Sequence, residues 1–325
     1  MALLAHLHGK TLLEPEQLNT LHQRSDLWGA YLTLHAWAMI LGAMAVYVWW
    51  SNPLTYLLAV VVIGGRQLGL AILMHDASHR ALFDSARVND WVGRYLLGAP
   101  VGADMDLYRP YHLTHHRHTQ SADDPDLELS APFPISRASL WRKVKRDLLG
   151  ITAYQRRGEQ FKLEMGDGPW VTRLQRLWRA EWPFLLSNAV LLAVLSVSGH
   201  PWLFVTLWLV PLATWYQLAS RVRNIAEHAV VGPAEDPLRN TRTTRANWIE
   251  RVLWAPYWVN YHLEHHLFLY TPCWRLPQAH AWLGERNLWP QMEIAENYSS
   301  VLRRATSGSD DRSGGGRKTT RVQAI

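Results

Sequence analysis

Nine of the sixteen histidines in this 325-residue chain fall in four short motifs. The motifs comprise His75 and His79; His112, His115 and His116; His228; and His262, His265 and His266. Residues three and four apart share one face of a helix, so a helical register would point the imidazoles of each multi-histidine motif in one direction. Imidazole is a ligand for zinc, copper, iron and nickel. The spacing therefore predicts a metal site.

The number of histidines bears on how many ions the site holds. A single pair four residues apart is weak evidence, because capping or surface histidines give the same spacing. The triplet His-x2-His-His is rarer, and it occurs twice. Nine ligands exceed what one ion binds, and a structural zinc site has four ligands that usually include cysteine. The only cysteine, Cys273, lies outside all four motifs. The residues therefore predict two ions with four or five ligands each.

Polar residues near the motifs suggest supporting roles. Metal-bound histidines usually donate their second N–H to a carboxylate or a carbonyl group. The acids inside the motifs, Asp76, Glu227 and Glu264, lie off the histidine faces, so we expect them to hold the ligands rather than bind metal. His118 lies six positions after His112 and should point away from the site.

Two long charge-free blocks must position these motifs. Residues 27–65 and 182–220 contain no Asp, Glu, Lys or Arg over 39 residues each. A membrane span needs about 20 apolar residues. Proline and glycine break the blocks at residues 51–53 and 199–201. We therefore predict four spans as two hairpins, at about 28–50, 54–74, 182–198 and 201–220, in an all-α fold. The alternative is two buried hairpins of a soluble protein.

The charges predict an orientation. Of the 33 Lys and Arg residues, two precede residue 27, 17 lie from Arg66 to Arg179 and 14 follow from Arg221. Positive residues favour the cytoplasmic side. This places both termini and all four histidine motifs in the cytoplasm, with the two turns opposite. The net charge of +6 suits anionic headgroups or an acidic protein partner. No nucleic-acid motif is present, so we expect no nucleic-acid binding.

These motifs and their order resemble the membrane fatty acid desaturase superfamily. Its three histidine boxes resemble residues 75–79, 112–116 and 262–266, and its extra Asn-x3-His motif resembles Asn224–His228. The resemblance covers about residues 28–285 and includes Asp124-Pro125-Asp126. It implies a four-span bundle with a cytoplasmic helical cap that holds two non-haem irons on all nine histidines. It also implies that Asn224 holds a water beside one iron.

The resemblance further implies O2-dependent oxidation of an unactivated C–H bond. The first expectation is a desaturase that inserts a double bond into a lipid acyl chain. The second is a hydroxylase or ketolase of the same superfamily acting on an alkane, a fatty acid or a carotenoid. A third, from another class, is a non-catalytic membrane metal-binding or transport protein. The histidines lie beyond the span ends rather than near the bilayer midplane, which argues against transport.

Other expectations concern partners and boundaries. No cysteine set for rubredoxin or ferredoxin and no cytochrome b5 context is present, so electrons should come from a separate donor of one of those types. The chain should divide into a polar lead at residues 1–26, a membrane domain at 27–300 and a disordered basic tail at 301–325. A bacterial inner membrane is the expected location. Arg66, inside the second span, should reach the membrane edge or meet a substrate headgroup.

Overall fold

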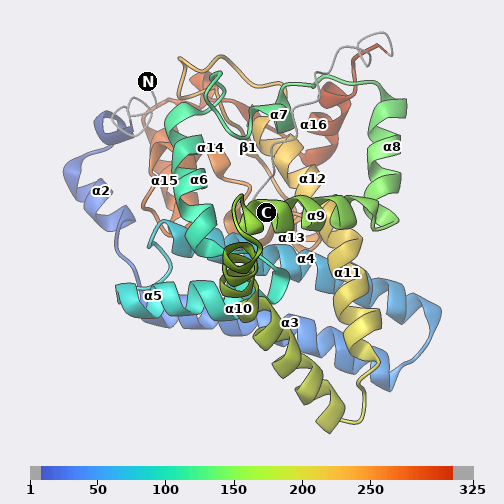
Figure 1. The fold of residues 1–325 in the computed structure, drawn as a ribbon. Coiled ribbons are helices and arrows are strands. Elements are labelled where there is room, and N and C mark those ends of the chain that lie inside the picture. Colours follow the sequence, from blue (N-terminus) through green and yellow to red (C-terminus); the bar gives the residue numbers. More distant parts are fainter. Residues whose placement is uncertain (1–8, 310–325) are drawn as a thin grey trace.

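The structure, a computed structural model, describes residues 9–309. It is mostly helical, and its only β-strands among these residues are a pair of two-residue parallel strands, β1 (Thr243–Thr244) and β2 (Ile294–Ala295). Figure 1 shows most of the shorter helices above the two long helices α3 (Asp26–Trp49) and α4 (Pro53–Ser78). The all-α expectation is therefore confirmed for the described residues.

Three helices in the described range are long and apolar enough to cross a bilayer: α3 (Asp26–Trp49), α4 (Pro53–Ser78) and α10 (Trp170–Val197). Ser25 caps α3, since its hydroxyl accepts from the Trp28 amide. Asn52 and Thr55 form a capping box at α4, whose first residue is Pro53. Leucines and valines on α3 and α10 are exposed, as expected for lipid-facing helices.

The first predicted hairpin agrees with the structure, and the second differs at both of its spans. Helix α10 begins at Trp170, twelve residues before the predicted span, because its first turns carry arginines that a search for apolar residues passes over. The segment predicted as one span at 201–220 is not one helix. It contains the π-helical turn η3 (Phe204–Leu209), α11 (Val210–Ala213), a break at Thr214 and then α12 (Trp215–His228). Among residues 9–309, three helices rather than four are continuous over the length of a span, so the number of spans stays a prediction.

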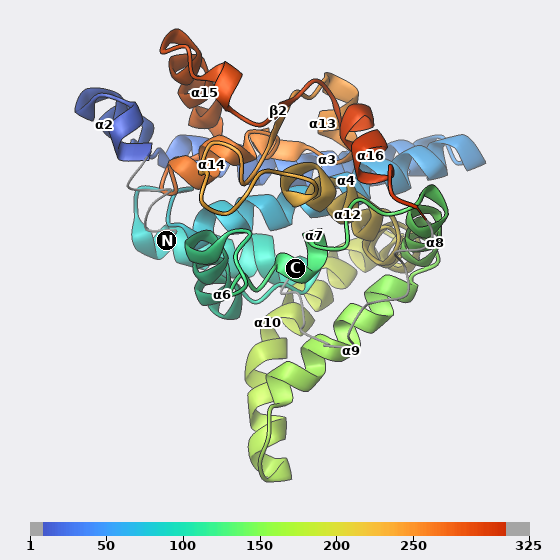
Figure 2. The same ribbon diagram turned by 90° about the horizontal axis from the view of Figure 1, so that it is seen from above.

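The cap is built from shorter elements. Those that precede α10 in the sequence are α2 (Pro15–Leu21), α5 (Ala86–Val92), η1 (Gly93–Gly98), η2 (Ala99–Val101), α6 (Met105–His118), α7 (Leu127–Ser130), α8 (Arg137–Leu148) and α9 (Ile151–Met165). After α12 come α13 (Trp248–Leu253), η4 (Pro256–Trp258), α14 (His262–Leu267), η5 (Cys273–Arg275), α15 (Leu276–Glu285), η6 (Trp289–Gln291) and α16 (Tyr298–Ala305). Figure 2 shows α9 and α10, which pack together, extending to one side of the molecule.

Helix α4 is the buried centre of the fold, and its glycines permit close packing. A Cβ on Gly64 would lie 2.8 Å from the Trp215 side chain of α12. A Cβ on Gly65 would lie 2.3 Å from the Val252 carbonyl oxygen of α13, and one on Gly69 would meet the Tyr257 ring. These contacts bring α12 and α13 onto the helix that ends at the first histidine motif.

Arg66 does not reach the membrane edge as expected. It is buried, and its guanidinium donates to the carbonyl oxygens of Arg251 at 2.7 Å and Val252 at 3.2 Å. The same guanidinium lies 5.5 Å from the centre of the Tyr257 ring. Arg66 therefore ties α4 to the C-terminal end of α13, where free carbonyls need donors.

Both terminal segments contain residues that pack against the rest of the protein. The lead segment is not merely polar, because Leu13 and Leu21 pack in a small core with Leu263 and Leu267 of α14. Helix α16 extends to Ala305 with Val301 buried, so the expected tail at 301–325 does not begin at residue 301. Residues 310–325 of that tail, and residues 1–8 of the lead, lie outside the described residues.

Candidate metal centre

All nine predicted histidines are buried, and they converge in two groups. The first group contains His75, His79, His112, His116 and His265. The second contains His115, His228, His262 and His266. Within each group the potential ligand nitrogens all lie within 4.8 Å of one another. This division into five and four fits the predicted pair of ions.

Four elements bring the groups together. His75 lies in the last turn of α4, and His79 caps that helix. His228 is the last residue of α12. Helices α6 and α14 each contribute to both groups: His115 of α6 faces the second group while its neighbours at 112 and 116 face the first. The motifs are helical as predicted, but the triplets bridge two sites rather than serving one.

The nitrogen atoms are arranged as they would be around cations. Four Nε2 pairs face each other at 2.8–3.1 Å, among them His112 with His116 and His228 with His262. Both ring nitrogens of His75 and of His79 are buried without a hydrogen-bond partner. Buried polar atoms normally have partners. Two nitrogens that bind one ion, each at about 2.1 Å, lie at most about 4.2 Å apart. The nitrogens within each group are separated by distances of this order.

Burial also sets the charge state of the cap histidines. It lowers the pKa of His112, His116, His228, His262, His265 and His266 well below the ordinary value, and neighbouring histidines add to the effect. These imidazoles are therefore neutral at pH 7, which is the form that binds a metal.

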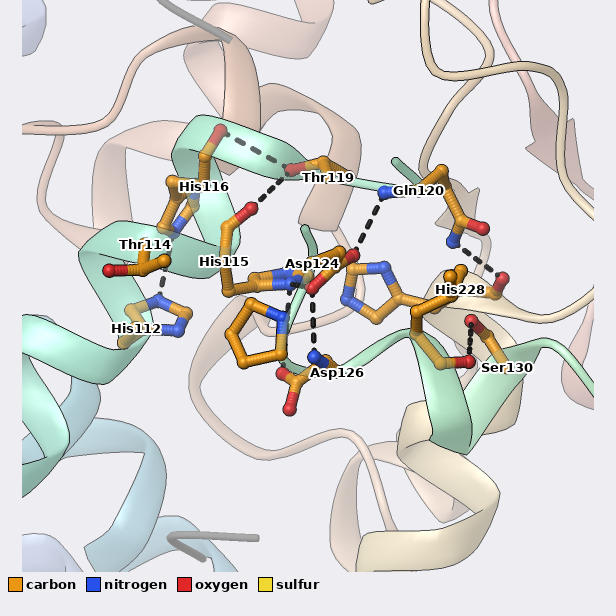
Figure 3. Close-up of polar contacts among 12 residues, drawn as sticks. His112, Thr114, His115, His116, Thr119, Gln120, Asp124, Asp126, Ser130 and His228 are labelled. Atoms are coloured by element: carbon orange, nitrogen blue, oxygen red, sulfur yellow. Dashed lines mark hydrogen bonds and ion pairs between the residues drawn. The ribbon is translucent and has the colours of Figure 1, made fainter. Parts of the chain in front are cut away.

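His115 differs because two carboxylates face it (Figure 3). Its Nδ1–H donates to Asp124 at 2.8 Å, and Asp126 lies 3.7 Å away. Burial alone would lower the pKa of His115, but these acids raise it. Asp124 is itself held by the amides of Gln120 and Asp126, each at 2.8 Å. The arrangement fixes the tautomer and leaves the Nε2 of His115 available to a metal.

Further contacts hold the second group. The Thr119 hydroxyl lies 3.3 Å from the Nδ1 of His266. Gln120 donates from its side chain to the His228 carbonyl at 3.0 Å (Figure 3). Arg242 is fully buried and donates to the carbonyls of Ala226, Ala229 and Val230 at 2.7–3.1 Å. It therefore caps the end of α12 that carries His228.

The three predicted acids have different surroundings. Asp76 lies 3.4 Å from the Nδ1 of His75 and accepts from the Cys273 amide. Glu227 has one oxygen 3.5 Å from the Nε2 of His262, on the side where that nitrogen faces the second group. Its other oxygen accepts from Arg223, and burial raises the pKa of Glu227 to about 7.

The expectation for Glu264 is not met. Its carboxylate accepts from the Thr243 hydroxyl and lies 2.6 Å from the Nδ1 of His280, so it faces α15 instead of a histidine of either group. Asn224 lines the same cavity as His75. His118 has a side chain one-third exposed and also lies outside both groups, as predicted.

Several supporting residues were not assigned a role from the sequence. Asp124 and Asp126 were noted only as part of the motif surroundings, although two acids shortly after a histidine triplet are a usable signal. Arg242 carries no such signal. Nothing in its local sequence distinguishes it from an exposed arginine.

The fold and this histidine centre place the chain in a known class of membrane oxidoreductases. It belongs to the fatty acid desaturase family, whose model matches residues 49–298. The chain is 28% identical to the dihydrorhizobitoxine desaturase of Bradyrhizobium elkanii, over 71% of this chain and 67% of that protein. It is 25% identical to a beta-carotene ketolase of Paracoccus sp. (strain PC1), over 77% and 87%. It is 24% identical to the sn-1 oleoyl-lipid 12-desaturase of Synechocystis sp. (strain ATCC 27184 / PCC 6803 / Kazusa), over 84% and 82%.

Proposed function

We propose that this chain is an O2-dependent di-iron desaturase that inserts a double bond into the acyl chain of a lipid. The observation that carries the proposal is the convergence of nine buried histidines into groups of five and four within a chain of the desaturase family. Two of the relatives described above are desaturases by name.

The nine histidines would hold two irons, five on one and four on the other. When bound, the irons supply the activation of O2 and the removal of hydrogen from an unactivated C–H bond. Asp124 orients His115 as a neutral ligand through the Nδ1–H. Glu227 places a carboxylate oxygen beside the four-histidine group and could complete its ligand set. Asn224 would hold a water in the cavity that it shares with His75.

A hydroxylase or ketolase is the second candidate. It is favoured by the similarity to beta-carotene ketolases, which covers most of both chains. The two outcomes share the first step, removal of one hydrogen from a carbon held near the centre. They differ in whether a second hydrogen leaves or oxygen is added. A non-catalytic metal-binding role is disfavoured by the family match and by a site buried inside the cap.

The membrane arrangement and the electron supply complete the proposal. The cap and both termini would face the cytoplasm of a bacterial inner membrane, with the turn at residues 50–52 on the opposite side. Electrons would come from a separate donor of the ferredoxin, rubredoxin or cytochrome b5 type. The basic surface charge suits an acidic donor.

Lipid mass spectrometry on cells expressing the wild type and His265→Ala tests the function. We expect species two mass units lighter in the wild type alone, because His265 belongs to the five-histidine group. His118→Ala serves as the matched control and should keep activity, since His118 lies outside both groups. Species sixteen units heavier would instead indicate hydroxylation, and fourteen units heavier a ketone.

Iron content separates loss of the site from loss of folding. Purified wild type should hold two irons per chain, and His265→Ala should hold fewer while remaining in the membrane fraction. Wild-type turnover by His265→Ala would exclude that residue as a ligand.

A further inference from the structure

A small cavity beside the histidine centre has a strongly basic lining. Its volume is about 150 Å³, and it reaches His75 and Asn224. Leu68, Ala71 and Ile72 of α4 give part of the lining an apolar surface. A cavity of about this volume holds a ligand the size of benzene. It therefore accepts one end of a substrate rather than a whole lipid.

Four cations line this cavity, and two of them are already neutralised. Arg221 donates to buried Asp147 at 2.5 and 2.8 Å, and Arg223 donates to Glu227 at 2.7 Å. Among residues 9–309, Lys143 and Arg156 form no ion pair with a carboxylate.

The remaining two cations interact electrostatically with Asp147, which already pairs with Arg221, but form no ion pair of their own among the described residues. Arg156 is directed by a hydrogen bond from its guanidinium to the Gln217 side chain at 3.0 Å. Burial and the neighbouring Arg221 lower the pKa of both Lys143 and Arg156, so their positive charges are destabilised where they stand. An anion bound between them would relieve that cost. Glu128 also lines the cavity, at an exposed position.

A second, more apolar cavity also borders Arg156. This second cavity of about 260 Å³ shares Arg156 with the first and is lined by Phe184, Leu209, Leu212 and Ala213. Cationic groups therefore lie next to apolar space, which is the arrangement that an amphiphile with one charged end requires.

We propose that Lys143 and Arg156 form a binding site for the anionic end, a carboxylate or a phosphate, of an amphiphilic substrate. The inference rests on the proposed function, because that function makes the bound amphiphile the substrate. It goes further by assigning the substrate class and two specificity-determining residues in α8 and α9.

Binding to the purified protein in nanodiscs of zwitterionic lipid tests the site without turnover. The probes are decanoate, decyl phosphate and decanol. Calorimetry under anaerobic conditions measures their binding. We expect wild type to bind one or both anions about tenfold or more tighter than decanol. The double variant Lys143→Gln with Arg156→Gln should lose that preference. Arg142→Gln with Lys145→Gln, at exposed positions of the same helix α8, should retain it.

The experiment distinguishes the possible sources of the anion and separates loss of the site from loss of folding. If decyl phosphate binds and phosphatidylglycerol added to the nanodiscs competes, the anion is a lipid headgroup; if decanoate binds without that competition, it is a free acid. The charge-conserving pair Lys143→Arg with Arg156→Lys should retain anion preference, which controls for folding. Equal binding of decanol and both anions by wild type, or an unchanged double variant, would overturn the site. Neither result depends on whether the protein oxidises a lipid.

Discussion

At the scale of single residues, the contact between His115 and Asp124 decides how one ligand is presented. Asp124→Asn keeps the size of the side chain but removes its negative charge, so the Nδ1–H of His115 loses its charged acceptor. We expect iron affinity to fall about 10- to 100-fold. Competition with a chelator, with the fraction of iron retained read by absorption, measures the change.

The neighbouring acid provides the control. Asp123 is mostly exposed and lies 4.0 Å from His118, which belongs to neither histidine group. Asp123→Asn should leave iron affinity unchanged. Equal losses in both variants would mean that general charge near α6, rather than the orientation of His115, governs binding.

The histidines could be predicted from the sequence, whereas most of their supports could not. Spacing of three and four residues places side chains close together wherever the helix lies, so all nine histidines join a metal-binding group as expected, although each triplet divides between the two groups. A supporting acid depends on which element packs opposite. Glu264 sits between two of the histidines in sequence and yet faces His280 of α15. Asp124 is nine residues from His115 and returns to it through a turn.

At the scale of elements, the close contact of α4 with α13 depends on Gly65. Gly65→Ala would place a Cβ 2.3 Å from the Val252 carbonyl oxygen, and backbone cannot rotate away as a side chain can. We expect the variant to lose about 1–3 kcal/mol of stability. Thermal unfolding in detergent measures it. Gly42→Ala in α3 is the matched control: no atom lies within 4 Å of its added Cβ, so stability should be unchanged or slightly higher.

The first hairpin was predicted well because both its spans are uninterrupted and capped at the turn. The second was predicted poorly because apolar composition fixes the length of a segment in the membrane but not its backbone continuity. Gln217 donates to the Leu212 carbonyl across the break at Thr214. Gln67 donates to the Trp208 carbonyl in the π-helical turn at 2.8 Å. Such compensation for irregular backbone comes from residues distant in sequence and is visible only in the fold.

At the scale of the whole molecule, the buried histidines make stability depend on pH. For the six cap histidines whose pKa is lowered, the unfolded chain binds protons below about pH 6.5 and the folded chain does not. Their contribution to stability is therefore lost as pH falls below 6.5, by up to about 1.4 kcal/mol per pH unit for each group. His115 acts oppositely, because its raised pKa stabilises the fold below about pH 6.5. Glu164 and Glu227 act in the same sense, since their raised pKa values of about 8 and about 7 let the folded chain bind protons that the unfolded chain does not. These groups offset part of the contribution of the six histidines.

We therefore expect the metal-free protein to unfold at progressively lower temperature as the pH falls from about 7.5 to about 5.5. Differential scanning fluorimetry in detergent after chelation measures the trend. A constant unfolding temperature across this range would mean that the imidazoles can be protonated inside the folded cap.

The orientation of the molecule can be tested with single cysteines, because the only native one, Cys273, is buried. Ser51→Cys introduces an exposed thiol in the turn between α3 and α4, and Ser307→Cys introduces one after α16, on the cap. If the cap faces the cytoplasm, a membrane-impermeant maleimide should label position 307 only in inverted inner-membrane vesicles and position 51 only in right-side-out ones. Wild type should remain unlabelled in both. Labelling of both positions from one side would contradict the proposed spans, and the reversed pattern would place the histidine centre outside the cytoplasm, away from cytoplasmic electron donors.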